Sequence, residues 1–299
     1  MSVAKLDLAH ELSDGRRLSY CEYGDSGGHA IVALHGTPGS RYKFGIADAE
    51  ARRLGLRLIS PDRWGYGLSD APQDAAWLGD YAADIADLAQ ALNLSCFGVV
   101  GISGGGPYAV ALASQLPERV KALALVAPLA PVSRAEERRG VSLFHRFAFR
   151  GLPGVPGAVP LAFLYFRGLL MVSPWLAART MSARAETPDR KLLADPEIAA
   201  DLARTFRTGL ASGVKGAALD MRCFCRGWRL DLGALKMPGR MWLGGQDRNV
   251  PLPAARKLAR RIDTLDIIEI DDAGHLWVTK HYLQVLEWLN KTMRGNSHR

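Results

Sequence analysis

The sequence is poor in cysteine, and its four cysteines suggest neither a disulfide framework nor a metal site. Cys21, Cys96, Cys223 and Cys225 are the only ones in 299 residues. The Cys223-x-Cys225 pair has no second ligand pair at the spacing that zinc sites use. A chain of this length buries roughly three-quarters of its unfolded surface, so it needs neither device to hold a core. We therefore expect no metal and no cofactor.

Lysine is also scarce, supplying only 9 of the 38 basic residues behind the net charge of +8. The arginines are scattered along the chain, singly or in pairs such as Arg52–Arg53 and Arg260–Arg261. Nucleic-acid-binding proteins instead concentrate basic charge on one element. We expect no nucleic-acid partner.

A long unbroken apolar run is missing as well. The most apolar stretch, Gly151 to Val172, holds Arg167 and three prolines, whereas a spanning helix needs about 20 predominantly apolar residues. Residues 1–11 lack the apolar core of a signal peptide. These two absences predict a cytoplasmic protein without a stable membrane span.

Short apolar runs alternate with helix-like patterns along most of the chain. Tyr81, Ile85, Leu88 and Leu92, for example, recur on one face of a helix. This alternation predicts an α/β fold with a mostly parallel sheet. The predicted strands are 17–23 (in a hairpin), 30–34, 56–60, 96–101, 122–127, 240–243 and 265–270.

The alternation stops between residues 129 and 213, where no strand-like run occurs and prolines punctuate helix-compatible sequence. We therefore predict an α/β core of residues 1–130 and 214–299, with a helical cap of residues 131–213 inserted between two strands.

The strongest motif is Gly101-Ile102-Ser103-Gly104-Gly105, which follows an apolar strand and precedes an Ala-rich helix. G-x-S-x-G in a strand–turn–helix context is the nucleophile elbow, where glycines make room for a sharp turn that exposes the serine hydroxyl. No lysine follows, so a phosphate-binding P-loop is disfavoured. Ser103 is the predicted nucleophile.

A serine nucleophile needs a base, and the base needs an acid that orients it. In chain order after Ser103, Gly244-x-x-Asp247 and Gly274-His275 each follow a predicted strand. We predict Asp247 as the acid and His275 as the base. Asp220, Asp271 and Asp272 remain alternative acids, and His35 is the other histidine in a strand-end turn.

The turn His35-Gly36-Thr37-Pro38-Gly39 is the predicted second half of an oxyanion hole. Acyl transfer needs donors aimed at the developing oxyanion. The backbone N–H groups of Thr37 and Gly104 are the candidates. We expect His35, Gly36 and Pro38 to support this loop.

Together these motifs resemble the α/β-hydrolase fold superfamily. The matching pieces, which span residues 34–275, are His35-Gly36-Thr37-Pro38, Asp62 to Ser69 (DRWGYGLS), Gly101 to Tyr108 (GISGGGPY), Gly244-x-x-Asp247 and Gly274-His275. The resemblance implies an eight-stranded sheet flanked by helices, a cap inserted after strand six, and a cis Thr37–Pro38 peptide bond.

Two differences from particular families of this superfamily narrow the expected function. Haloalkane dehalogenases and epoxide hydrolases of this superfamily have Asp where this chain has Ser103, and proline iminopeptidases usually have Trp where it has Gly104. We expect a serine hydrolase of small to medium apolar esters or lactones. The alternatives are a proline-iminopeptidase-like peptidase or amidase, a C–C bond hydrolase, a cofactor-free perhydrolase, and a non-catalytic small-ligand receptor.

The predicted cap carries more apolar surface than short helices bury by themselves. Phe163, Phe166, Leu170 and Trp175 are the candidates for lining a substrate pocket. We expect this segment to roof the site, and the alternative is that it docks on a membrane surface.

Overall fold

The computed structural model describes residues 4–74, 76–173, 176–177, 180 and 185–296. The strands are β1 Lys5–Glu11, β2 Arg17–Gly24, β3 His29–Leu34, β4 Leu56–Pro61, β5 Phe97–Ile102, β6 Val120–Val126, β7 Gly239–Gly244 and β8 Leu265–Ile270. The helices are α1 Asp48–Arg53, α2 Tyr81–Ala91, α3 Gly105–Gln115, α4 Leu143–Arg146, α5 Leu152–Gly154, α6 Ala158–Val172, α8 Thr187–Leu193, α9 Pro196–Gly209, α10 Lys215–Cys225, α11 Leu252–Ala259 and α12 Tyr282–Asn296. Short 3₁₀ or π turns are η1 Arg41–Ala47, η2 Leu78–Asp80, η3 Phe147–Gly151, η4 Leu232–Ala234 and η5 Trp277–Lys280.

The eight strands form one sheet in the order β1-β2-β4-β3-β5-β6-β7-β8. β1 and β2 pair antiparallel with each other, β2 pairs antiparallel with β4, and every other pairing is parallel. The prediction of a mostly parallel eight-stranded sheet is therefore confirmed. Since parallel strands end at one edge, the loops after β3, β5, β7 and β8 meet there.

Side chains alternate between the two faces of the sheet, as the period of a strand requires. In β3, Val32 and Leu34 join the core beneath α2, α3 and α11, whereas Ile31 and Ala33 join the core beneath α1 and α12. Both faces are covered by helices, which is why the parallel strands read as continuous apolar runs.

β1 was not among the strands predicted from apolar runs. Its side chains are mostly exposed, and a bulge interrupts its register with β2 between Lys5 and Leu8. An edge strand whose side chains are mostly exposed leaves no apolar run in the sequence.

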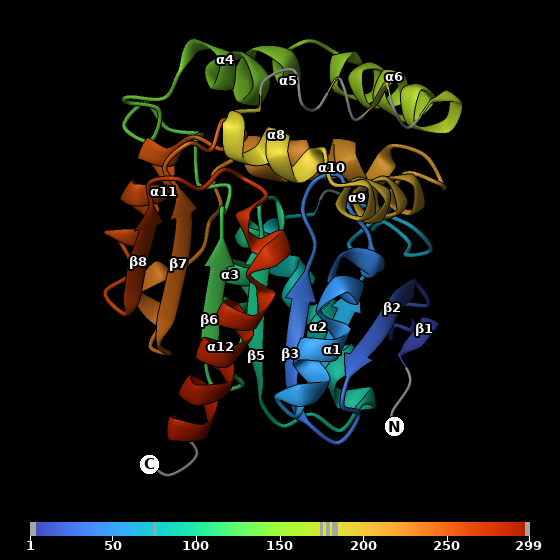
Figure 1. Ribbon diagram of the computed structural model, residues 1–299, viewed down its shortest axis with the longest axis vertical. Coiled ribbons are helices and arrows are strands. Elements are labelled where there is room, and N and C mark those ends of the chain that lie inside the picture. Colours follow the sequence, from blue (N-terminus) through green and yellow to red (C-terminus); the bar gives the residue numbers. More distant parts are fainter. Residues whose placement is uncertain (1–3, 75, 174–175, 178–179, 181–184, 297–299) are drawn as a thin grey trace.

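Helices α4, α5, α6, α8 and α9 follow β6 and lie above the carboxyl edge of the sheet, with α4, α5 and α6 forming the outermost layer (Figure 1). The outer face of α6 is exposed and apolar, including Leu161, Leu164 and Tyr165. Within the described residues no single helix is long and apolar enough to cross a membrane. The bent pair Leu143–Gly154 and Ala158–Val172, with 112° between its halves, meets the length and composition requirement only when taken together.

Candidate active site

Ser103 lies at the sharp turn between β5 and α3, and two glycines make that turn possible. Its φ of 53° is in the left-handed region, which is strained for a residue with a side chain. A Cβ on Gly101 would lie 2.6 Å from the Gly105 carbonyl oxygen, and one on Gly105 would lie 2.3 Å from the Leu34 carbonyl oxygen. The Ser103 backbone N–H donates to the Val126 carbonyl at 2.9 Å, which anchors the turn to β6.

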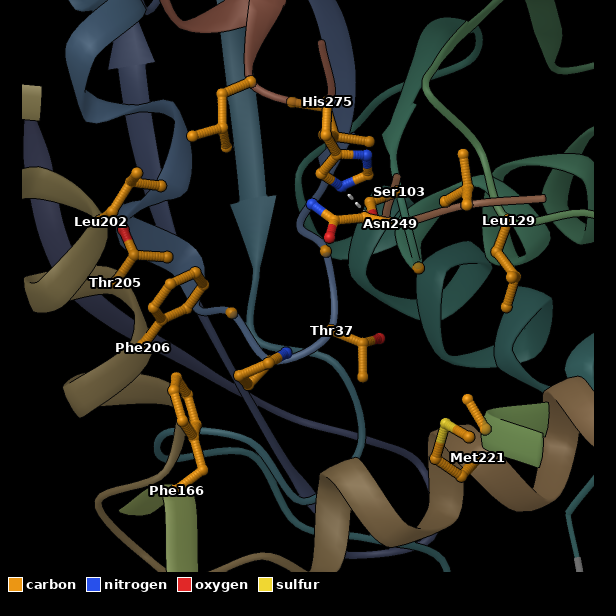
Figure 2. Close-up of a pocket in the computed structure, with 18 of the residues that line it drawn as sticks. Thr37, Ser103, Leu129, Phe166, Leu202, Thr205, Phe206, Met221, Asn249 and His275 are labelled. Atoms are coloured by element: carbon orange, nitrogen blue, oxygen red, sulfur yellow. Dashed lines mark hydrogen bonds between the residues drawn. The ribbon is translucent and has the colours of Figure 1, made fainter. Parts of the chain in front are cut away.

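His275 and Asp247 reach this serine from the loops after β8 and β7. His275 Nε2 lies 3.0 Å from Ser103 Oγ (Figure 2), and His275 Nδ1 lies 2.7 Å from Asp247 Oδ2. The other Asp247 oxygen accepts the backbone N–H groups of Asn249 at 2.7 Å and Val250 at 3.2 Å. The structure thus brings together the three residues that the sequence predicts, with the acid held rigidly behind the base.

The surroundings of His275 favour its charged form. Burial opposes protonation, but the charge of Asp247 and its hydrogen bond outweigh burial, so the pKa of His275 lies above its ordinary value of 6.5. A base that receives a proton from Ser103 becomes an imidazolium, and Asp247 is placed to stabilise that ion.

The rival residues lie elsewhere. Asp271 and Asp272 are exposed, and Asp220 is buried in an ion pair with Arg63. His35 Nε2 accepts the Arg63 backbone N–H at 3.0 Å, so its Nδ1–H donates to the Gly36 carbonyl at 2.8 Å. Burial and the nearby Arg63 charge hold the pKa of His35 well below 6.5. Both of its nitrogens are occupied by the loop, which leaves it no role in the Ser103 relay.

Thr37 and Gly104 lie side by side next to Ser103. The Thr37–Pro38 bond is cis, and a Cβ on Gly104 would lie 2.1 Å from Thr37 Oγ1 and 3.1 Å from Thr37 N. Within the described part of the chain, no hydrogen bond uses the backbone N–H of either residue. The two donors are therefore adjacent and available, as an oxyanion hole requires.

A buried ion pair beneath the oxyanion loop was not recognised from the sequence. Arg63 pairs with Asp220, and the two are 0% and 1% exposed. Thr37 Oγ1 donates to Asp220 at 2.5 Å and accepts from Arg63 at 3.1 Å, so the pair holds the loop directly. The hydroxyls of Tyr66 and Tyr108 also donate to Asp220, at 2.7 and 2.8 Å. Removing one partner of such a pair typically costs about 3–5 kcal/mol, because it leaves an uncompensated buried charge.

Asp189 of α8 is a second residue that sequence reasoning missed. Its carboxylate accepts the backbone N–H groups of His275 at 2.8 Å and Leu276 at 2.9 Å. A Cβ on Gly274 would lie 2.3 Å from Asp189 Oδ1, so glycine is needed for this approach. A helix inserted between β6 and β7 thereby holds the loop that carries the base. No sequence signal pointed to this contact, because it joins residues 86 positions apart.

A cavity of about 460 Å³ opens at Ser103 and His275. Most of its wall is apolar: Leu202 and Phe206 lie on one side of Ser103 and Thr37, and Leu129 and Met221 lie on the other (Figure 2). Among the described residues, no group of three or more His, Cys, Asp or Glu side chains could hold a metal ion.

Two of the four predicted pocket residues line this cavity, namely Phe163 and Phe166. Leu170 does not, and that prediction is wrong: it lies in a separate buried cluster with Tyr66 and Leu210. Leu170 is two helical turns beyond Phe163, about 10 Å further along α6, which carries it past the cavity. Trp175 lies outside the described residues.

Comparisons with known proteins agree with this architecture. The family described as "alpha/beta hydrolase fold" matches residues 29–151. The non-heme chloroperoxidase of Streptomyces lividans is 36% identical over 121 residues, which cover 40% of this chain and 44% of that enzyme, so the match spans less than half of the relative. The 2-hydroxymuconate semialdehyde hydrolase of Pseudomonas putida is 25% identical over 90% of this chain and 88% of its own length.

Structural similarity extends over nearly the whole molecule. An esterase from Exiguobacterium antarcticum superposes with a TM-score of 0.71 over 97% of this chain and all of its own, at 18% identity. The sheet and its strand order agree with this structure, and the family match covers the elbow itself, so the chain has the α/β-hydrolase fold.

Proposed function

We propose that this protein is a serine hydrolase that cleaves small to medium apolar carboxylic esters or lactones through an acyl-enzyme. The observation that carries the proposal is the relay from Asp247 through His275 to Ser103, with separations of 2.7 and 3.0 Å. A non-catalytic receptor on this fold would have no need of a strained serine aligned with a buried acid and base.

The relay determines which groups give and accept the proton in each step of the reaction. Ser103 Oγ attacks the acyl carbon while its proton passes to His275 Nε2, and the carbonyl oxygen becomes an oxyanion beside the Thr37 and Gly104 N–H groups. His275 then gives the proton to the departing alkoxide as the C–O bond breaks. Water attacks the acyl-enzyme with the same base, which releases the acid and restores Ser103.

The wall of the cavity favours esters or lactones with apolar groups. The cavity wall includes the apolar side chains of Leu129, Leu202, Met221 and Phe224. A charged amine that entered the cavity would lose hydration without gaining favourable contacts with these side chains. Peptidase, amidase, C–C bond hydrolase and perhydrolase activities would use the same relay, and they are the alternatives that a substrate screen must separate.

A fluorophosphonate probe tests the proposal directly. We expect covalent labelling of Ser103, identified by mass spectrometry of the labelled peptide, because the probe reacts with a serine only where a base activates it. Ser114 is a suitable control, since this buried serine in α3 donates to the Asp231 carbonyl and has no base. Labelling that persists in Ser103→Ala, or no labelling of the folded wild type, would contradict the assignment.

Phe163 and Phe166 should set the preference for apolar chain length. Each methylene buried against them contributes about 0.8 kcal/mol, a few-fold per carbon in kcat/KM. We expect a series of p-nitrophenyl esters of increasing acyl length to show a rising profile that Phe163→Ser and Phe166→Ser flatten.

Leu161→Ser and Tyr165→Ser are the matched controls, because these residues lie on the exposed face of the same helix. They should leave the profile intact. If they instead abolish binding to anionic liposomes while Phe163→Ser and Phe166→Ser leave the length profile unchanged, the segment is a membrane anchor and the pocket preference is set elsewhere.

A further inference from the structure

A buried lysine lines the cavity that holds Ser103. Lys43 belongs to η1, directly after the oxyanion turn, and is 6% exposed. Helix α9 packs against η1, and the Tyr282 hydroxyl donates to the Lys43 carbonyl at 3.3 Å. The backbone of this lysine is therefore fixed, and its side chain is part of the cavity wall.

Within the part of the chain that the structure describes, the ammonium of Lys43 makes no hydrogen bond and no ion pair within 4.0 Å. Burial lowers the pKa of Lys43, and the charge of Asp201 on α9 opposes that effect without forming a salt bridge. A buried cation without a partner is costly, and an anion that entered the cavity would offset that cost.

We propose that Lys43 forms a subsite that binds a carboxylate of the substrate. Its ammonium has three N–H donors and a positive charge, which match the acceptor-only oxygens of a carboxylate. The inference deepens the proposed function: the preferred substrate is an ester or lactone with an apolar body and one carboxylate.

Two carboxylates near Lys43 or the cavity do not remove this preference. Asp189 lines the cavity, and each of its oxygens accepts a backbone N–H, from His275 and Leu276. Asp201 is the one carboxylate whose charge acts on Lys43, and burial raises the pKa of Asp201. Asp201→Asn is therefore expected to strengthen, not weaken, the binding of an anion.

The test compares p-nitrophenyl hemiesters of glutaric, adipic and pimelic acid with p-nitrophenyl esters of the monocarboxylic acids of equal chain length. A second pair, 4-carboxyphenyl butanoate and phenyl butanoate, places the carboxylate on the leaving group. We expect at least one carboxylate substrate to exceed its neutral counterpart in kcat/KM. Lys43→Met should reduce the ratio of kcat/KM for the carboxylate substrate to kcat/KM for its neutral counterpart about ten- to hundred-fold.

Lys280→Met is the matched control, because it removes the same charge from the exposed surface of η5. The ratio should not change in that variant, whereas Asp201→Asn should raise it. If Lys43→Met, checked for folding by thermal unfolding, changes the ratio no more than Lys280→Met does, the subsite is absent. Equal rates for all carboxylate and neutral pairs in the wild type would also overturn it, with ester hydrolysis itself intact.

Binding to Ser103→Ala separates this inference from the proposed chemistry. We expect calorimetry to show tighter binding of monomethyl adipate than of dimethyl adipate, and loss of that difference when Lys43→Met is added. This difference is expected even if no ester is turned over, so failure of the proposed function and failure of the subsite give different results. Equal binding of the two ligands would overturn the subsite.

Discussion

Replacing Ser103 with alanine should lower kcat for p-nitrophenyl butanoate about 10⁴- to 10⁶-fold, and His275→Ala should lower it to a similar extent. Members of a catalytic triad act as a unit, so the loss of either removes nearly all the acceleration that the nucleophile provides. The residual rate would come from the Thr37 and Gly104 donors and from binding alone. Steady-state kinetics, with burst-phase measurements of the acyl-enzyme, would check this result.

Both variants should remain folded, because neither removes a partner from the Arg63–Asp220 pair. Thermal unfolding curves close to that of wild type provide the control. Activity of Ser103→Ala within tenfold of wild type would show that the nucleophile is misassigned. A mild effect of His275→Ala, combined with a severe effect of a well-folded His35→Ala, would show that the base is wrong.

Asp247→Asn should lower kcat about 10⁴-fold while leaving the fold intact. The Asn carbonyl oxygen would keep the backbone N–H groups of Asn249 and Val250, so its NH₂ group would face His275 Nδ1. An NH₂ group donates to Nδ1, and the imidazole is then held in the wrong tautomer for accepting a proton from Ser103. The carboxylate oxygen lies 2.7 Å from His275 Nδ1, so the substitution acts directly on the base.

The same variant should change the pH profile in a defined direction. Neutral His275 is the active form, and Asp247 helps to hold its pKa above 6.5, so kcat/KM of wild type should fall as the pH drops through that raised pKa. Removal of the carboxylate lets burial dominate, and the acid limb of the residual activity should move to lower pH.

Asp271→Asn is the matched control, because this exposed residue lies in the His275 loop and should leave both kcat and the acid limb unchanged. Loss of activity in folded Asp272→Asn, with Asp247→Asn near wild type, would show that the acid is misassigned. Asp220→Asn needs a stability measurement beside the kinetics, since it disturbs a buried charge pair.

Local sequence patterns were sufficient to predict much of the fold and the three residues of the Ser103–His275–Asp247 relay. The strands β3 to β8 follow short apolar runs, because a parallel sheet covered on both faces buries consecutive side chains, and the hairpin strand β2 follows a weak alternation. The positions of Ser103, Asp247 and His275 also follow from the sequence. Each stands in a turn directly after a strand, and parallel strands bring those turns to one edge regardless of the residues between them.

The tertiary structure decided what depends on contacts across the chain. Arg63 and Asp220 are 157 positions apart, and only folding shows that they hold the oxyanion loop. The apolar excess of the predicted cap pointed to Phe163 and Leu170 alike, but it could not say where the cavity ends along α6. Nothing in the sequence distinguishes Lys43 from a surface lysine, and its burial where α9 packs against η1 is what makes it a candidate for substrate recognition. The composition of the sequence and the spacing of its apolar residues determine which helices and strands form and which loops meet. The surroundings of one charged side chain, by contrast, are set by packing between segments that are distant in the sequence.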